Sequence, residues 1–297
     1  MQQQVNRNLR PFFKRLTLTF GVAAGLVVGP FPVLGQAPSA PAAIAPAGPT
    51  YADLASLAEA SDLVIRAKIR KQTVLKPERA PGLAAGFARL YIQADTVALI
   101  AGRSAVGAGL AYLVDVRLDA KGKVPKLKNR EMLLFADTVA GRPGEVQLVA
   151  PGAQLDFTPE LEARLRPILT ELYDQSAPAR ITGISDALAV PGTLAGESET
   201  QIFLATEDRS PVSITILRRP GQRVQWGVSW GEIIDSAARP PSPETLRWYR
   251  LACALPAQLP SNANLARDPA ARRLAAGDYA FVLAQLGPCE RRITPTS

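Results

Sequence analysis

Histidine is absent from all 297 residues of the chain. This residue is the commonest general base in enzymes, so its absence excludes every Ser-His and Cys-His nucleophile scheme. The G-x-S-x-G pattern at residues 227–231 therefore lacks the partner that a serine nucleophile needs, and Ser229 is expected to be structural. Two cysteines without histidine also make a zinc site improbable. We accordingly expect no metal and no cofactor.

Cysteine is nearly absent too, because Cys253 and Cys289 are the only two. Their spacing excludes a redox C-x-x-C motif. In an oxidising compartment an isolated pair is more often bonded than free, the alternative being two buried thiols. We predict a Cys253–Cys289 disulfide.

Acidic residues are missing from the N-terminus, where the first is Asp53. Four cations precede an apolar run over residues 16–28, namely Arg7, Arg10, Lys14 and Arg15. This is the plan of a signal peptide, and the run is shorter than the roughly 20 residues that a membrane-spanning helix needs. We predict a signal peptide over residues 1–37, cut after Ala37 or after Ser39. The mature protein is then expected in the periplasm or secreted, without a transmembrane segment.

The excess of positive charge is modest once this leader is removed. The whole chain has 34 basic and 26 acidic residues, and removal of the four leader cations leaves 30 against 26, or +4. Such a dispersed excess does not indicate a nucleic-acid binder.

The densest charge cluster is a predicted loop at residues 121–130, which carries Lys121, Lys123, Lys126, Lys128 and Arg130. With the cations of residues 66–70 it could form a face that binds lipopolysaccharide, phospholipid head groups or an acidic protein. The alternative is a solvated hairpin whose charges keep a sheet edge from aggregating.

A Pro- and Ala-rich stretch at residues 38–50 reads as a tether that leads into a first domain at residues 51–177. Thr50 and Asp53 predict a capping box that opens a short helix, and residues 63–70 alternate as a strand with one apolar face. Further strands are expected at residues 90–100, 110–118, 132–138 and 146–149. Five short strands suggest a small OB-like barrel or sandwich, closed by a helix that begins at Thr158 and is kinked or split at Pro167.

A second domain is expected at residues 178–297, as an antiparallel sheet with flanking helices, so the chain is α+β and β-rich. Its strands are predicted at residues 181–190, 200–205, 212–217 and 223–230, the last two joined by a type II turn at 219–222. Helices are expected to begin at Ser242 and at Asp268, the second ending at Gly277. Residues 279–286 fit a strand or a helix, and the strand is favoured.

The predicted hairpin of this second domain offers another candidate site. Trp226 and Trp230 fall on one face of the last strand, and three arginines flank the turn, namely Arg218, Arg219 and Arg223. Together they could stack against and bind an anionic ligand. The alternative is that the two tryptophans belong to the core.

Pairs of acids are the only candidates for catalysis, because glycoside hydrolysis needs two carboxylates at a fixed separation. Three such pairs are Glu160/Glu162, Glu197/Glu199 and Glu232/Asp235. Thirteen Asp and thirteen Glu make chance pairs inevitable, and acids at a helix N-terminus also oppose the macrodipole.

Four short segments carry a resemblance to known sequences, namely Gln-Ile-Phe-Leu at 201–204, Ser-Ile-Thr-Ile-Leu-Arg-Arg-Pro-Gly-Gln at 213–222, Arg-Leu-Ala-Cys at 250–253 and Leu-Gly-Pro-Cys at 286–289. In these the chain resembles uncharacterised exported proteins of sphingomonad-type alphaproteobacteria. The resemblance implies a periplasmic address and no activity. The first half also looks like secreted OB-type barrels, in pattern only, so no binding residues are carried over.

Together these features predict an exported, non-enzymatic binding or assembly module of the cell envelope. Its partner would be an envelope protein or an anionic envelope component, not a nucleic acid. The alternative is a carboxylate-dependent hydrolase that acts on envelope glycan or peptide. A cleft with converging acids would favour the enzyme, and a flat basic or aromatic surface would favour the binder.

Overall fold

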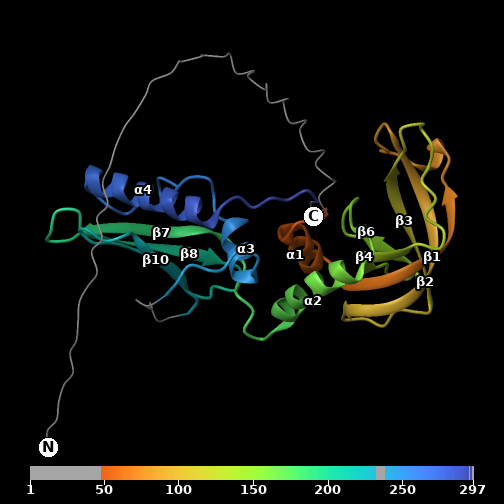
Figure 1. Cartoon of the computed structure of the whole chain (residues 1–297), viewed down its shortest axis with the longest axis horizontal. Coiled ribbons are helices and arrows are strands. Elements are labelled where there is room, and N and C mark those ends of the chain that lie inside the picture. The colour runs from red at the N-terminus through yellow and green to blue at the C-terminus, as the bar shows by residue number, and fades with distance from the viewer. Residues whose placement is uncertain (1–47, 232–237, 294, 296–297) are drawn as a thin grey trace, which may run out of the picture. The chain divides into compact units, whose positions relative to one another are not determined.

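Six strands in the first half of the chain form one sheet, here called the barrel sheet (Figure 1). The strands are β1 (Leu63–Val74), β2 (Phe87–Gly102), β3 (Gly109–Arg117), β4 (Glu131–Thr138), β5 (Val146–Leu148) and β6 (Gln154–Asp156). They lie in the order β3-β2-β1-β4-β5, with β6 also paired to β4. Between β1 and β2 lies the short helix η1 (Pro77–Arg79).

A single bridge between Ala111 and Glu145 joins β3 to β5 and brings the two ends of the strand order together. The structure shows a six-stranded antiparallel sheet whose two edge strands β3 and β5 lie next to each other, and the small OB-like barrel stays a prediction. The apolar face predicted for β1 is confirmed, since Leu63, Ile65 and Ile69 are fully buried. Strand β6 had not been predicted, because three residues are too few for a periodic pattern.

The second sheet contains β7 (Ile181–Pro191), β8 (Ser198–Thr206), β9 (Val212–Arg218) and β10 (Gln225–Ser229), all antiparallel in the order β10-β9-β8-β7. The predicted turn joins β9 to β10. The amide of Gln222 donates to the carbonyl of Arg219 at 3.1 Å, and Gly221 has a φ of +70°, which a type II turn requires at that position.

Helix α1 (Tyr51–Ala60) opens with the predicted capping box. The Asp53 amide donates to Thr50 Oγ1 at 3.0 Å, and the Thr50 amide donates to Asp53 Oδ2 at 2.9 Å. Helix α2 (Pro159–Tyr173) is capped by Thr158 as expected and continues through Pro167, so of the two outcomes expected there, a kink or a split, the split is wrong. Pro167 faces solvent, so water can satisfy the carbonyl that its missing N–H leaves free.

The two C-terminal helices differ from the bounds predicted for them. Helix α3 (Leu246–Ala252) is capped by Thr245, three residues after the expected Ser242. Helix α4 (Pro269–Leu286) begins as predicted but continues through Gly277, so the strand expected at 279–286 is wrong. Buried residues at helical spacing hold this helix against the sheet, namely Ala271, Ala275, Tyr279, Val282 and Leu286.

One apolar core connects both sheets with the helices. It includes Leu133 and Phe135 of β4, residues of α1 and α2, and Ile202, Ile214 and Trp226 of the second sheet. The predicted disulfide is confirmed, with the Cα atoms of Cys253 and Cys289 5.1 Å apart. The mixed, strand-rich α+β class is likewise confirmed.

The computed structural model describes residues 48–231, 238–293 and 295. The predicted signal peptide and most of the predicted tether lie outside these residues. Among the helices of the described part, none is long and apolar enough to cross a bilayer.

Candidate functional site

The lysine-rich segment is a loop at residues 118–130, called the lysine loop, and its backbone is fixed to β1. Gln72 accepts from the Leu127 amide at 2.6 Å and donates to the Pro125 carbonyl at 3.0 Å. The Asn129 amide donates to the Ile69 carbonyl at 2.7 Å. With Leu127 buried between them, Lys126 and Lys128 are held outward on an anchored loop.

All four lysines of the loop are exposed, namely Lys121, Lys123, Lys126 and Lys128. In the described part of the chain, no ion pair involves any of them. On β1 only the arginines are paired. Arg66 lies 2.6 Å from Glu131 and over the Phe157 ring, and Arg70 lies 3.0 Å from Asp95. Lys68 and Lys71 of β1 are exposed, and no ion pair involves either of them in the described residues. The expected basic face is therefore supplied by the four lysines of the loop, with a smaller contribution from the lysines of β1.

The positive charge is unequally distributed over the two halves. Residues 62–157 contain fifteen Lys and Arg against nine Asp and Glu, whereas residues 158–297 contain fifteen of each. The excess charge that remains after leader removal thus belongs to the barrel sheet and its loops, where the lysine loop projects.

At the hairpin, two of the predicted binding residues make the contacts of the core alternative. Trp226 is 8% exposed and packs in the core. Arg218 Nε donates to Asp278 Oδ1 at 2.6 Å, and Asp278, which is fully buried, also accepts from the Thr200 hydroxyl. Arg218 therefore links β9 to α4 through its ion pair with Asp278. Its neighbour Arg219, in contrast, is exposed.

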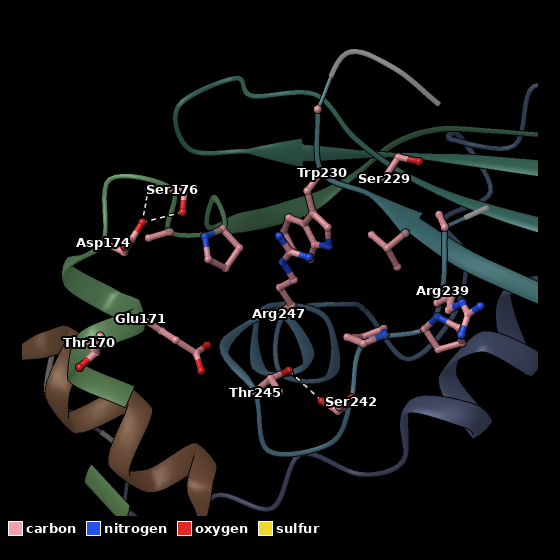
Figure 2. Close-up of a pocket in the computed structure, with 17 residues that line it drawn as sticks. Thr170, Glu171, Asp174, Ser176, Ser229, Trp230, Arg239, Ser242, Thr245 and Arg247 are labelled. Carbon is pink, nitrogen blue, oxygen red and sulfur yellow. Dashed lines mark hydrogen bonds between the residues drawn. The ribbon is translucent and has the colours of Figure 1, made fainter. Parts of the chain in front are cut away.

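Trp230, the remaining predicted residue, lines a cleft of about 1210 Å³ between α2, β10 and the segment before α3. Figure 2 shows its ring directed toward Arg247, whose guanidinium carbon lies 6.0 Å from the ring centroid. Arg239 and Glu171 also line the cleft. Glu171 Oε2 accepts from the Leu246 amide at 2.9 Å and so caps α3. The cleft offers a stacked aromatic and cation pair but borders residues 232–237, which are not described.

The acids of the predicted pairs are engaged in local contacts. The pKa of Glu160 is lowered by its backbone amide and by the Thr158 hydroxyl, as expected at a helix N-terminus. Glu162 pairs with Arg166, and Glu199 accepts from Gln201 at 2.8 Å. Glu197 accepts from the Leu194 amide at 3.3 Å. The pair Glu232/Asp235 lies outside the described residues.

Asp174 is a second acid in the cleft and has the environment of a stable carboxylate. The hydroxyl and the amide of Ser176 lower its pKa. A general acid needs the opposite shift. Among the described residues, no three Asp, Glu or Cys side chains gather as metal ligands.

Close packing around Gly227 accounts for the first glycine of the G-x-S-x-G pattern at residues 227–231. A Cβ at this position would lie 2.0 Å from the Ala238 carbonyl oxygen, so only glycine lets that backbone cross β10. Ser229 is 5% exposed within the sheet. The sequence pattern singles out Gly227, but it does not reveal that the segment at Ala238 requires a glycine there.

Sequence reasoning missed a groove of about 990 Å³ on the barrel sheet. It is lined by β2, β3 and β5, by the turns around Lys76 and Arg142, and by Tyr91 and Leu113, which face each other across the two strands. Leu113 is 49% exposed. In the sequence it had been indistinguishable from a core residue.

Comparisons with known proteins do not assign the chain to a family. The resemblance to exported alphaproteobacterial proteins therefore stays a prediction. No protein-family model matches the chain, and a search of curated proteins finds no match to it.

Proposed function

We propose that the protein is an exported, non-catalytic binding module of the cell envelope that contacts an anionic envelope component or an acidic envelope protein through the lysine loop. The observation that carries the proposal is the loop itself, with four exposed lysines on an anchored backbone and no ion-pair partner for them in the described residues. Uncompensated cations held together raise the local concentration of anions and speed their association.

Export from the cytoplasm is part of the same proposal. The disulfide and the lack of a membrane-crossing helix in the described residues are compatible with it. The basic, apolar leader ahead of the predicted cut near Ala37 supplies the route to the periplasm.

The proposal is tested by measuring the binding of residues 38–297 to vesicles that contain phosphatidylglycerol, to lipopolysaccharide micelles and to polyglutamate. One variant replaces Lys121, Lys123, Lys126 and Lys128 by alanine. A matched control replaces four exposed arginines of the other half, Arg164, Arg209, Arg267 and Arg273, which lie outside the hairpin candidate, and so removes the same charge.

We expect the lysine variant to lose at least about tenfold in affinity for one of these probes, since each cation near an anionic surface contributes about 1 kcal/mol. The control should lose less than about threefold. Equal losses would show a nonspecific effect of net charge and reject the loop as the site. Turnover of a glycan or peptide probe would favour the carboxylate-dependent hydrolase instead.

A further inference from the structure

The groove on the barrel sheet has apolar side chains that stay open to water. Val74 at the end of β1 is 51% exposed, and Leu113 of β3 is 49% exposed. Three half-buried aliphatic residues line the groove beside them, namely Leu75, Val139 and Leu148. Single exposed apolar residues are common on protein surfaces, but several that share one concavity are typical of a ligand site.

Both acids that line the groove are paired with arginines. Arg89 donates from Nε and Nη2 to the two carboxylate oxygens of Asp115, at 2.7 and 2.8 Å. Its Nη1 donates to the Pro81 carbonyl at 3.2 Å, so all three nitrogens of this guanidinium are engaged. Arg142 lies 3.3 Å from Glu145. These paired groups leave few free partners for a ligand with many polar groups, and they suit an apolar chain.

Two cations of the groove, in contrast, are unpaired. Lys76 and Arg79 are exposed, and no ion pair involves either of them in the described residues. Lys76 follows Val74 and Leu75 directly in the chain, so this charge lies beside the apolar residues. Four basic and two acidic side chains line the groove, which leaves two positive charges to attract an anion.

A hydrocarbon chain fits this groove better than a polypeptide does. Strands β3 and β5 lie next to each other and are joined by the Ala111–Glu145 bridge, so they offer no gap for the backbone of a further strand. A hydrocarbon chain has no N–H or C=O groups that need partners. The groove volume of about 990 Å³ lies within the range of about 300 to 1,000 Å³ that is typical of small-molecule sites.

We propose that the groove binds a lipid with a single hydrocarbon chain and an anionic head group. The chain lies on Val74 and Leu113, where its burial removes apolar surface from water. The head group lies at Lys76 and Arg79, whose charges it compensates. This site is separate from the one in the proposed function, because none of the four lysines of the lysine loop lines the groove.

The test uses residues 38–297 with decanoate, and with octanoate and dodecanoate to vary the chain length, all below their micelle concentrations. Acetate supplies the charge without the chain. Decanol and decyltrimethylammonium supply the chain with a neutral and a cationic head group. Calorimetry measures binding, and methyl NMR signals of Val74 and Leu113 report on the groove. The reference signal is that of Leu188, which is 41% exposed on β7 of the second sheet.

We expect the affinity to rise about two- to fourfold with each methylene group from octanoate to dodecanoate, where fourfold corresponds to complete burial. Decanoate should shift the signals of Val74 and Leu113 and leave that of Leu188 unchanged. Leu113→Ser should weaken decanoate binding at least about fivefold, and its matched control Leu188→Ser less than about twofold. Both positions are exposed, so both variants should fold.

The contribution of the head group is tested by charge. Lys76→Gln combined with Arg79→Gln should weaken decanoate at least about fivefold and change decanol less than about twofold. The matched control is Lys121→Gln combined with Lys123→Gln, which removes the same charge from the lysine loop and should change decanoate less than about twofold. Decanol and decyltrimethylammonium should bind the wild-type protein at least about fivefold more weakly than decanoate.

Several outcomes would overturn the proposal. Absence of decanoate and dodecanoate binding would reject it outright, and acetate that binds as tightly as decanoate would mean that charge alone is recognised. Equal binding of the three decyl head groups would mean that only apolar surface is recognised. Signals of Val74 and Leu113 that shift with protein concentration alone would make the groove a contact between copies. Loss of decanoate binding in the lysine-loop control alone would reject the groove and leave the proposed function standing.

Discussion

Arg218 of β9 holds Asp278 of α4, with Nε 2.6 Å from Oδ1 of a carboxylate that is completely buried. The two residues are 60 positions apart, and Thr200 of β8 donates a second hydrogen bond to the same carboxylate. This pair fixes the long C-terminal helix on the second sheet. Its charges compensate each other inside the fold.

Removal of the cation should therefore be costly. We expect Arg218→Met to lower the free energy of unfolding by about 3 kcal/mol, because it leaves a buried carboxylate without its ion-pair partner. Arg219→Met, next to it on the surface, should change it by less than about 0.5 kcal/mol. Urea denaturation of the two variants makes the comparison. Similar losses in both would contradict the structural role of Arg218.

The disulfide should contribute measurably to stability. Replacement of both Cys253 and Cys289 by serine should lower the free energy of unfolding by about 3 to 4 kcal/mol, the range expected when a cross-link that closes a loop of this size is lost. Reductant should destabilise the wild-type protein by a similar amount in guanidinium titrations. It should leave the double-serine variant unchanged, and a response of that variant would point to another cause.

Gly227 should tolerate no side chain. Gly227→Ala would place a Cβ 2.0 Å from the Ala238 carbonyl oxygen, so either β10 or the crossing segment must move, at a cost of about 1 to 3 kcal/mol or more. Gly183→Ala is the matched control in the same sheet, because nothing lies within 4 Å of its added Cβ. Thermal unfolding should separate the two. Equal melting temperatures would show that the segment after β10 is not packed in this way.

Tyr112 should make the protein sensitive to alkali. Burial inside the barrel sheet raises its pKa well above the usual value near 10, and its hydroxyl donates to Gln154 at 2.7 Å. Above pH 10 the unfolded chain releases this proton while the folded chain keeps it. The free energy of unfolding should then fall by about 1.4 kcal/mol per pH unit from this group alone.

Denaturation of Tyr112→Phe between pH 9 and 11.5 tests this, with exposed Tyr173→Phe as the control. At neutral pH the variant should lose about 1 kcal/mol with the hydrogen bond. Its alkaline decline should be shallower than that of the wild type. Parallel curves for wild type and variant would assign the decline to other groups.

Local patterns predicted the elements whose neighbours in sequence determine them. The alternation of β1 and the capping box of α1 depend on residues within a few positions, as do the Pro-Gly turn and the charge density of the lysine loop. Helix α4 was misread because Gly277 is a stop signal by local rules, whereas Tyr279 and Val282 are buried by a sheet formed about 80 residues earlier. Tertiary burial outweighed propensity there.

The same distinction between local sequence and tertiary contacts applies to the candidate sites. The exposed lysines could be predicted because charge alone keeps them in water. The roles of Arg218 and Trp226 depend on partners that only the folded chain supplies. The groove on the barrel sheet could not have been anticipated, because β3 and β5, which line it, are far apart in the sequence and meet only in the folded chain.

Asp53, which caps α1, also accepts from the amides of Arg292 and Ile293 at 2.7 and 2.8 Å, and the Thr50 hydroxyl donates to the Glu290 carbonyl at 2.7 Å. The Asp53 carboxylate thus links the beginning and the end of the described fold by hydrogen bonds. A short loop that joins them, with new ends opened in the exposed segment 174–177 between α2 and β7, should give a circularly permuted chain with the same core. In such a chain the order of the two sheets along the polypeptide could be reversed without changing what either one contacts.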